Sequence, residues 1–298
     1  MTNYEYSLEV ERALAEERPV VALESTVVTH GLPYPQNLAL AKDMEAEIRS
    51  QGCIPATIAV LNGKVHIGLD EAALERLAAA QGMRKISARD FGPAVALRQS
   101  GGTTVAGTLL AASGSDIEVF ATGGIGGVHR QAPFDVSADL TMLGRTPMVV
   151  VCAGAKAILD LPATLEMLET LCVPVVGYQT DELPAFYSRS SGLPLSIRCD
   201  TPKQVAEIAR AHWELGQQSA VLVTVPVPVE AALPANEVQG AIDRALDEAH
   251  AQHITGQAVT PFLLRRVSEL TGGASLKANL ALLLNNARVA AQIALNLK

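Results

Sequence analysis

Short runs of β-branched and other apolar residues alternate with helix-like stretches along most of this chain, and this alternation constrains the fold more than any other feature. Met148–Cys152 is apolar at every position, which is typical of a strand buried on both faces. Such strands, separated by helices, predict an α/β fold with three layers (α/β/α), in which helices cover both faces of a mostly parallel or mixed sheet. The predicted strands are Val20–Val28, Ala56–Leu61, Lys64–Ile67, Glu118–Thr122, Met148–Cys152, Val173–Gly177, Leu195–Arg198 and Ala220–Val225.

The predicted helices have recognisable ends. Glycines stand where a left-handed residue would follow the last helical turn, at positions 52, 82, 101 and 216. Thr260-Pro261 is a helix-start signal for a helical C-terminal tail. No repeat or low-complexity linker interrupts the pattern, so we expect residues 1–298 to form one α/β/α domain. The other helices are expected at Gln36–Gln51, Glu71–Gln81, Arg89–Ser100, Thr104–Ser113, Thr164–Leu171, Pro202–Leu215 and Glu237–His253.

Composition limits the partners of the chain. A net charge of −8 and the absence of a Lys/Arg-rich block argue against nucleic acid, because phosphate neutralisation needs concentrated positive charge. The acidic N-terminus does not resemble a secretory signal, and no segment offers about 18 uncharged apolar residues to cross a membrane. The four cysteines have no C-x-x-C spacing. We therefore expect a cytoplasmic protein with reduced thiols that acts on a small molecule and not at a membrane.

A glycine-rich segment, Ala121–Arg130, follows one predicted strand and suggests a small polar ligand held close to the backbone. It does not match the dinucleotide fingerprint G-x-G-x-x-G, because His129 stands where the third glycine would fall. A P-loop is excluded too, because no Gly-Lys-Ser/Thr follows. The chain also lacks the motifs of a serine hydrolase or a zinc protease.

Two charged residues stand out against apolar surroundings. Glu24 lies within the predicted strand Val20–Val28, so it is either one half of a buried ion pair or an acid with a raised pKa suited to proton transfer. Lys156 follows the strand Met148–Cys152 among Gly and Ala residues. It either extends into water or, if desolvated, is a nucleophile that can form a Schiff base.

Other polar residues have two interpretations each. Asp135 and Asp139 are helix-capping residues or carboxylates of a hard-cation site completed by water and phosphate. Thr103-Thr104 is either a helix cap or a site for a phosphate or a carbonyl group. Lys85 is an ordinary surface lysine by default, and Asn279 most simply an exposed or packing amide. The residues alone thus indicate an α/β protein with an acidic-plus-lysine cleft beside a glycine loop.

Taken together, these segments resemble the pseudouridine-5′-phosphate glycosidases over nearly the whole chain, from about residue 8 onward. The resemblance rests on long blocks that include Val21–Thr26 with His30-Gly31, Gly102–Ala106, Ala121–Arg130, Phe134–Leu140, Val150–Lys156, Gly177–Thr180, Thr260–Leu264 and Leu270–Gly273. The departures are a shorter connection between Arg130 and Phe134 and different residues around Ser188–Pro194.

The resemblance implies a role for each site residue. The nucleophile of the family falls on Lys156 and its proton donor on Glu24. A divalent metal, usually Mn²⁺, falls on Asp135, and the family suggests a homotrimer. Substrate contacts fall on Lys85, Val105, Ser137, Ala138, Asp139 and Asn279.

The implied reaction is reversible cleavage of a carbon–carbon glycosidic bond, which gives uracil and ribose 5-phosphate through a lysine–sugar imine. The two-carboxylate scheme of ordinary glycosidases does not transfer, because the bond to be broken joins C1′ to a ring carbon. Two alternatives remain open at this point. The same lysine would serve a Schiff-base aldolase or lyase acting on another phosphosugar, and a non-catalytic regulator would bind the phosphosugar without consuming it.

Overall fold

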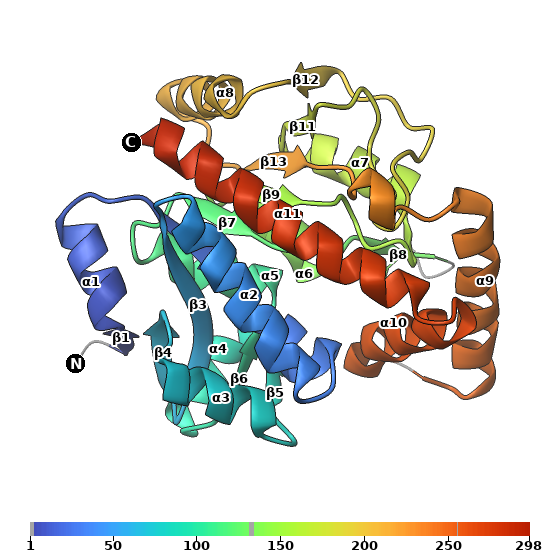
Figure 1. Ribbon diagram of the computed structural model, residues 1–298, viewed down its shortest axis with the longest axis horizontal. Helices are drawn as coiled ribbons and strands as arrows, with labels where there is room; N and C mark the ends of the chain where they lie inside the picture. Colours follow the sequence, from blue (N-terminus) through green and yellow to red (C-terminus); the bar gives the residue numbers. More distant parts are fainter. Residues whose placement is uncertain (1–2, 131–133, 255) are drawn as a thin grey trace.

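An eleven-stranded sheet organises the computed structural model, which describes residues 3–130, 134–254 and 256–298 (Figure 1). β8 (Val128–His129) and β10 (Leu159–Asp160) form a separate antiparallel pair. The strands of the large sheet are β1 (Tyr4–Tyr6), β2 (Val20–Leu23), β3 (Ile54–Leu61), β4 (Lys64–Ile67), β5 (Arg84–Ile86), β6 (Gly101–Thr103), β7 (Val119–Ala121), β9 (Val149–Cys152), β11 (Val175–Tyr178), β12 (Ile197–Cys199) and β13 (Val221–Thr224).

The sheet is parallel at its centre and mixed at one side. Its main order is β1-β4-β3-β2-β7-β9-β13-β11-β12, with β5 and β6 attached beside β3. All pairs from β3 through β2 and β7 to β12 are parallel, whereas β3 pairs antiparallel with β4 and β6. The prediction of a mostly parallel or mixed sheet is confirmed.

Helices cover both faces of this sheet. In the view of Figure 1, α2 and α11 run side by side across the front, while α5, α6 and α7 lie behind the strands. The helices are α1 (Leu8–Ala15), α2 (Gln36–Ser50), α3 (Glu71–Ala79), α4 (Phe91–Ala96), α5 (Val105–Ser113), α6 (Ala138–Leu143), α7 (Leu161–Thr170), α8 (Pro202–Glu214), α9 (Ala235–Ala251), α10 (Val259–Leu270) and α11 (Ala274–Leu297), with short helical turns η1 (Val27–Gly31), η2 (Ala88–Asp90), η3 (Val229–Ala231) and η4 (Gly256–Ala258).

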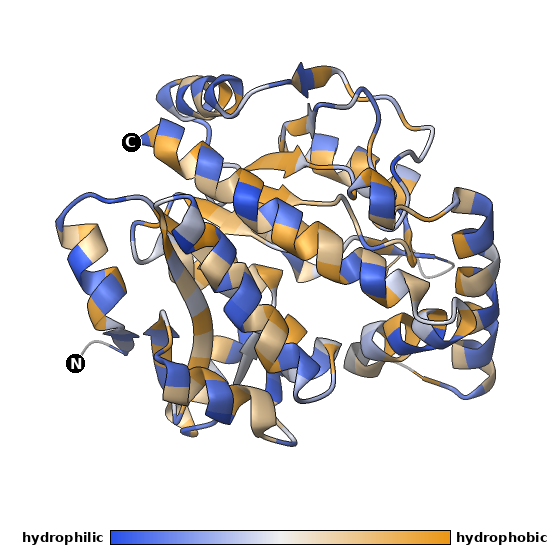
Figure 2. Cartoon of the chain, in the orientation of Figure 1, coloured by the Kyte–Doolittle hydropathy of each residue, from blue (hydrophilic) through white to orange (hydrophobic). Residues whose placement is uncertain are grey.

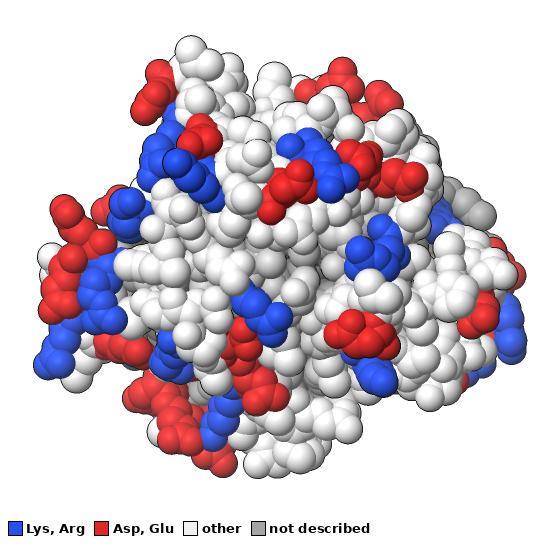
Figure 3. Space-filling model, turned by 45° about the horizontal axis from the view of Figure 1, so that its top comes forward, with Lys and Arg blue, Asp and Glu red and all other residues white. Residues whose placement is uncertain are grey.

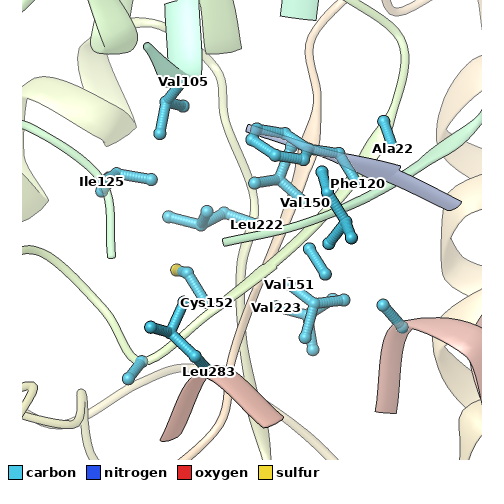
Figure 4. Packing of buried hydrophobic residues seen from close by; sticks show 14 of the residues in the cluster. Ala22, Val105, Phe120, Ile125, Val150, Val151, Cys152, Leu222, Val223 and Leu283 are labelled. Atoms are coloured by element: carbon cyan, nitrogen blue, oxygen red, sulfur yellow. The ribbon is translucent and has the colours of Figure 1, made fainter. Parts of the chain in front are cut away.

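Sequence and hydropathy explain these layers. Thr201 caps α8 by accepting the backbone N–H of Gln204 with its side chain, and Pro202 occupies the first helical position. Figure 2 shows apolar central strands and helices that alternate between hydrophilic and hydrophobic faces. Side chains of the central strands fill the interior between Val105 of α5 and Leu283 of α11 (Figure 4). This pattern confirms the three-layer α/β/α prediction.

The C-terminal tail is a core helix. α11 is long and apolar enough to span a membrane by length and composition alone, yet half of its most apolar window is buried inside the protein. It packs against α2, α8 and the strands β2, β7 and β9. This packing agrees with the prediction of a helical tail lying on the sheet.

Three local predictions are wrong. The strand expected over Val20–Val28 ends at Leu23, because the chain leaves the sheet there and enters η1. Gly101 is not a helix terminator but the first residue of β6, and the preceding helix α4 already ends at Ala96. The tail helix α10 begins at Val259, so Thr260 lies inside its first turn instead of capping it.

Candidate active site

The polar residues expected at strand ends meet where the sheet changes its winding direction. From β2 the chain crosses through α2 to β3 on one side, whereas β7 and β9 follow on the other side of β2. In open parallel sheets such a switch point leaves a crevice beyond the carboxyl ends of the strands. Glu24 directly follows β2, the glycine segment follows β7, and Lys156 follows β9. Glu24 therefore lies at a strand end and not within a strand as predicted.

A pocket of about 380 Å³ occupies this crevice. Its lining comes from the ends of β2, β7 and β9, from β5, from the starts of α5 and α6, and from α10 and α11. Every predicted site residue lines it: Glu24, Lys85, Val105, Asp135, Ser137, Ala138, Asp139, Lys156 and Asn279. Residues up to 255 positions apart in the chain are thus brought to one cavity, and their individual roles stay predictions.

Glu24 is an acid whose environment favours its protonated form. Burial raises the pKa of its carboxyl group, and the nearby Asp139 carboxylate raises it further. Lys156, the Thr122 hydroxyl and Lys85 act in the opposite direction. Thr122 Oγ1 donates a hydrogen bond of 2.5 Å to Glu24 Oε1 across the β2–β7 junction. A carboxyl group with a raised pKa is suited to both giving and taking a proton.

Two lysines face the same cavity. Lys156 lies on the turn after β9, where its backbone N–H donates to Ile125 O at 3.1 Å. Burial lowers the pKa of the Lys85 amine, and the positive charge of Lys156 lowers it further, while Asp139 and Glu24 oppose these effects. The interpretation of Lys85 as an ordinary surface lysine is therefore wrong. The pocket holds amine groups beside an acid, a combination suited to Schiff-base chemistry.

Asp139 links the start of α5 and the start of α6 to the glycine segment through hydrogen bonds. Its Oδ1 accepts the backbone N–H of Ala106 and its Oδ2 accepts that of Gly126, each at 2.8 Å. Ser137 is the N-cap of α6, and its hydroxyl accepts the N–H of Asp139 at 3.2 Å. The residue that caps α6 is therefore Ser137, which lies between Asp135 and Asp139, the two aspartates for which capping was one interpretation.

We expect Asp139→Asn to lower the free energy of unfolding by about 2 kcal/mol, because the amide NH₂ would face a backbone donor that loses its acceptor. Asp135→Asn is the matched control, since the Asp135 side chain is 57% exposed and an exposed substitution changes stability by about 0.5 kcal/mol or less. Urea unfolding of both variants measures the difference. Equal stabilities would contradict the clamping role of Asp139.

Of the other polar residues near the helix starts, some support the fold and some line the pocket. Thr103 is fully buried and its hydroxyl donates to Ile58 O at 2.8 Å, so it supports the sheet. Thr104 caps α5 and also lines the pocket. The Val105 side chain is 1% exposed within the core, which leaves mainly its backbone to meet a ligand. His30 also lines the pocket, and burial together with Lys85 lowers its pKa.

The glycines after β7 are required by protein neighbours. A Cβ on Gly126 would collide with Ser137 and Asp139, and one on Gly124 would lie 2.6 Å from Phe186 Cε2. A Cβ on Gly123 would lie 3.1 Å from Leu283 Cδ2. The prediction that this segment lines a ligand site agrees with its place in the pocket. Its glycines are nevertheless explained by close packing of the protein on itself.

Sequence reasoning missed two residues that shape the site, Asn286 and Phe186. Asn286 of α11 is fully buried, and its Nδ2 donates to Thr122 O at 2.9 Å, which holds the residue that bonds Glu24. Phe186 lines the pocket from the loop after β11. Only tertiary contacts reveal these roles, although an amide on an apolar helix face was a visible signal at Asn286.

A metal site of the predicted kind would depend on water and substrate. Asp135 lies at the pocket edge, with its Oδ2 4.0 Å from His129 Nδ1. Within residues 3–130, 134–254 and 256–298, no group of three or more His, Cys, Asp or Glu side chains could enclose an ion. This donor set fits a hard cation that keeps most of its waters. The shortened connection, residues 131–133, lies outside the described residues.

Comparison with known proteins identifies the family. Residues 9–296 match the family model described as "Indigoidine synthase A like protein". The chain belongs to this family. The pseudouridine-5′-phosphate glycosidase of Paracoccus denitrificans is 55% identical over 292 residues, which cover 97% of this chain and 96% of the relative. That of Geobacillus kaustophilus is 54% identical over 291 residues, covering 97% of each. The resemblance found in the sequence is therefore confirmed.

Two solved structures similar to this chain share the fold. The prealnumycin C-glycosynthase AlnA, in complex with ribulose 5-phosphate, superposes with a TM-score of 0.91 at 42% identity and covers 99% of this chain and 96% of its own. An indigoidine synthase A-like protein of Thermotoga maritima gives a TM-score of 0.90 at 37% identity, covering 98% and 96%. The α/β/α architecture is thus that of the family.

Proposed function

We propose that this protein is an enzyme that reversibly cleaves the C–C glycosidic bond of pseudouridine 5′-phosphate to give uracil and ribose 5-phosphate. The observation that carries the proposal is the convergence of an acid with a raised pKa, Glu24, and an amine, Lys156, on one pocket at the switch point of the sheet. Relatives of 48–55% identity over nearly the whole chain are pseudouridine-5′-phosphate glycosidases.

In the first step, the Lys156 amine attacks C1′ of the ribose while Glu24 protonates the ring oxygen. The C1′–O4′ bond breaks and the sugar opens, with a new C1′–N bond to the lysine. The raised pKa of Glu24 suits this step, because the carboxyl group must hold a proton until the oxygen leaves.

In the second step, the Glu24 carboxylate takes a proton from the new C1′–NH₂⁺ group, and the freed nitrogen lone pair forms a C=N bond as the C1′–C5 bond to uracil breaks. The released electron pair on C5 takes up a proton, for which Glu24 is again the donor after it regains one. Water then hydrolyses the imine and returns Lys156 to its free form with ribose 5-phosphate as the product.

The phosphate group of the sugar would bind at the starts of α5 and α6. Backbone N–H groups at Val105 and Ala138 lie in the first turns of these helices, where donors without intrahelical partners are available to an anion. Lys85 adds positive charge on the same lining. This arrangement accounts for the substrate contacts inferred for these residues, with Asn279 of α11 as a further polar contact on the wall of the pocket.

A divalent metal ion, with Mn²⁺ as the first candidate, would be held by Asp135 through ordered water and would position the phosphate. We expect EDTA-treated enzyme to lose most of its activity and to recover it with added Mn²⁺. Asp135→Asn should raise the Mn²⁺ concentration needed for half-maximal activity by about tenfold, the usual order for losing a metal contact. Mn²⁺ binding followed by electron paramagnetic resonance provides a readout independent of turnover. Full activity in rigorously metal-free protein would contradict the metal requirement.

The function itself is tested by following uracil release from pseudouridine 5′-phosphate with added Mn²⁺, and uracil consumption in the presence of ribose 5-phosphate. A Schiff-base aldolase or lyase would trap a sugar phosphate on the lysine but release no uracil. A non-catalytic regulator would bind the substrate and leave it intact.

The homotrimer and the cytoplasmic location stay predictions, as does the absence of a nucleic-acid or membrane partner. On the face shown in Figure 3, basic and acidic side chains are interspersed.

A further inference from the structure

Arg130 binds two carbonyl groups of the turn that follows Lys156. Its Nη2 donates to Ala157 O and its Nε donates to Leu159 O, each at 3.1 Å. The turn itself closes with a hydrogen bond of 2.9 Å from Leu159 N–H to Lys156 O. Ala157 and Leu159 are 5% and 2% exposed, so water has little access to them. The turn that carries Lys156 is therefore bound to one guanidinium group.

The glycine segment holds the same stretch of chain just before the turn. Ala155 forms a bridge with Ile125, and Lys156 N–H donates to Ile125 O at 3.1 Å. β10, which begins at Leu159, pairs antiparallel with β8, and Arg130 is the first residue after β8. Backbone contacts thus fix the chain up to Lys156, and Arg130 adds side-chain contacts to the residues that follow it.

The same guanidinium also contacts α9, which lies near β8 in Figure 1. Arg130 Nη1 is 3.6 Å from Asp243 Oδ1, and its Nη2 is 3.4 Å from Gln239 Oε1. Both partners belong to α9 and lie one helical turn apart, on the same face. The Asp243 side chain is 58% exposed, so this ion pair contributes little to stability. Its effect is to orient the guanidinium toward the turn.

Arg130 acts from outside the pocket. Its neighbour His129 and its partner Leu159 line the cavity, but Arg130 is not among the described residues that do. The guanidinium therefore affects the site through the backbone of the turn and not by touching a substrate.

We propose that Arg130 is a positioning residue for Lys156, which fixes the turn so that the lysine amine meets C1′ of the sugar in the geometry of attack. The inference rests on the proposed function. A displacement of reacting groups by about 1 Å can slow a reaction about 10²-fold, so a loosened turn would cost rate. Arginine suits this role because its donors form a rigid planar fork that stays charged. One flat group can thus bind Ala157 O, Leu159 O and α9 together.

The test measures how fast ribose 5-phosphate forms an adduct on Lys156, trapped with borohydride and followed by intact mass. Arg130→Met keeps a long side chain but removes every donor. We expect its adduct rate at saturating sugar phosphate to fall about 10–100-fold. The half-saturating concentration should change less than about threefold, because the phosphate binds at α5 and α6. Arg130→Lys keeps the charge without the planar fork. It should stay at least about fivefold slower than wild type, and it gives a second route if the methionine variant folds poorly.

Arg210→Met is the matched control. Arg210 of α8 is also partly buried and donates to a backbone carbonyl, that of Asn296, away from the pocket. Its adduct rate should stay within about twofold of wild type, the small effect usual for a substitution remote from a site. A wild-type rate in a folded Arg130 variant, a loss explained wholly by a higher half-saturating concentration, or an equal loss in Arg210→Met would overturn the proposal. Failure of the wild-type protein to form the adduct and release uracil would instead refute the proposed function.

Discussion

Lys156→Ala should abolish formation of a covalent adduct with ribose 5-phosphate and reduce uracil release by at least about 10⁴-fold, the order expected when a covalent nucleophile is removed. Among the described residues, Lys156 is the lysine of the pocket that follows the carboxyl end of β9. Lys85, the other lysine that lines the pocket, comes from β5, which pairs with β6. Intact mass spectrometry after borohydride reduction measures the adduct directly.

Lys85→Met is the control for this prediction. It removes the second pocket amine but leaves Lys156 in place, so an adduct should still form, with weaker binding of the phosphosugar. An adduct on Lys156→Ala at the wild-type rate would mean that another residue is the nucleophile. An adduct lost only in Lys85→Met would assign that role to Lys85.

Glu24→Gln should reduce uracil release by about 10²–10⁴-fold, the usual contribution of a positioned acid–base group. The amide keeps the size of the side chain and can still accept the Thr122 hydroxyl bond, but it cannot supply a proton to the ring oxygen. Turnover and urea unfolding measured on the same preparation separate loss of chemistry from loss of fold. Near-normal turnover of a folded Glu24→Gln protein would refute the role of the acid.

The pH dependence provides an independent check on Glu24. Because its carboxyl group must be protonated for the first step, activity falls as pH rises through its pKa, which burial holds above the ordinary value. The Thr122 hydrogen bond favours the carboxylate and so lowers this pKa. Thr122→Val should therefore move the descending limb of the kcat/KM profile to higher pH, and Thr122→Ser should restore it. A limb that stays in place in both variants would assign it to another group.

Much of the fold could be predicted because its strands carry a strong local signal. The run that became β9 is apolar throughout and the run that became β13 has Thr224 as its one polar position, so both are predicted as buried strands from the sequence alone. The ends of the strands and helices were harder to predict. Val27 and Val28 continue the β-branched pattern of β2, but the chain turns into η1 where the sheet ends. Gly101 shows the same limit, since a glycine suits both a helix end and a strand that needs close approach to its neighbour.

The candidate site was predictable in its membership but not in its geometry. The resemblance to a family placed Glu24, Lys156 and Asp139 in one site, and the structure brings them to one pocket. That Asp139 is bound by two backbone N–H groups, or that a hydrogen bond from Thr122 reaches across 98 positions to Glu24, has no local signal. Phe186 gave no signal either, because its place in the pocket depends on contacts with distant residues: its ring lies against Gly124 and its backbone N–H donates to Ala153 O.

The amino-acid sequence by itself determined the α/β class, the helical tail and the residue types available for chemistry, because hydrophobic periodicity and side-chain chemistry are local properties. Only the tertiary structure decided that Glu24 leaves the sheet at its edge, that Lys85 is drawn into the pocket, and that the glycines pack against protein. The physical reason is that burial, charge proximity and steric contact depend on which distant segments meet. The order of β2, β7 and β9 in the sheet determines that the segments following these strands meet in one pocket.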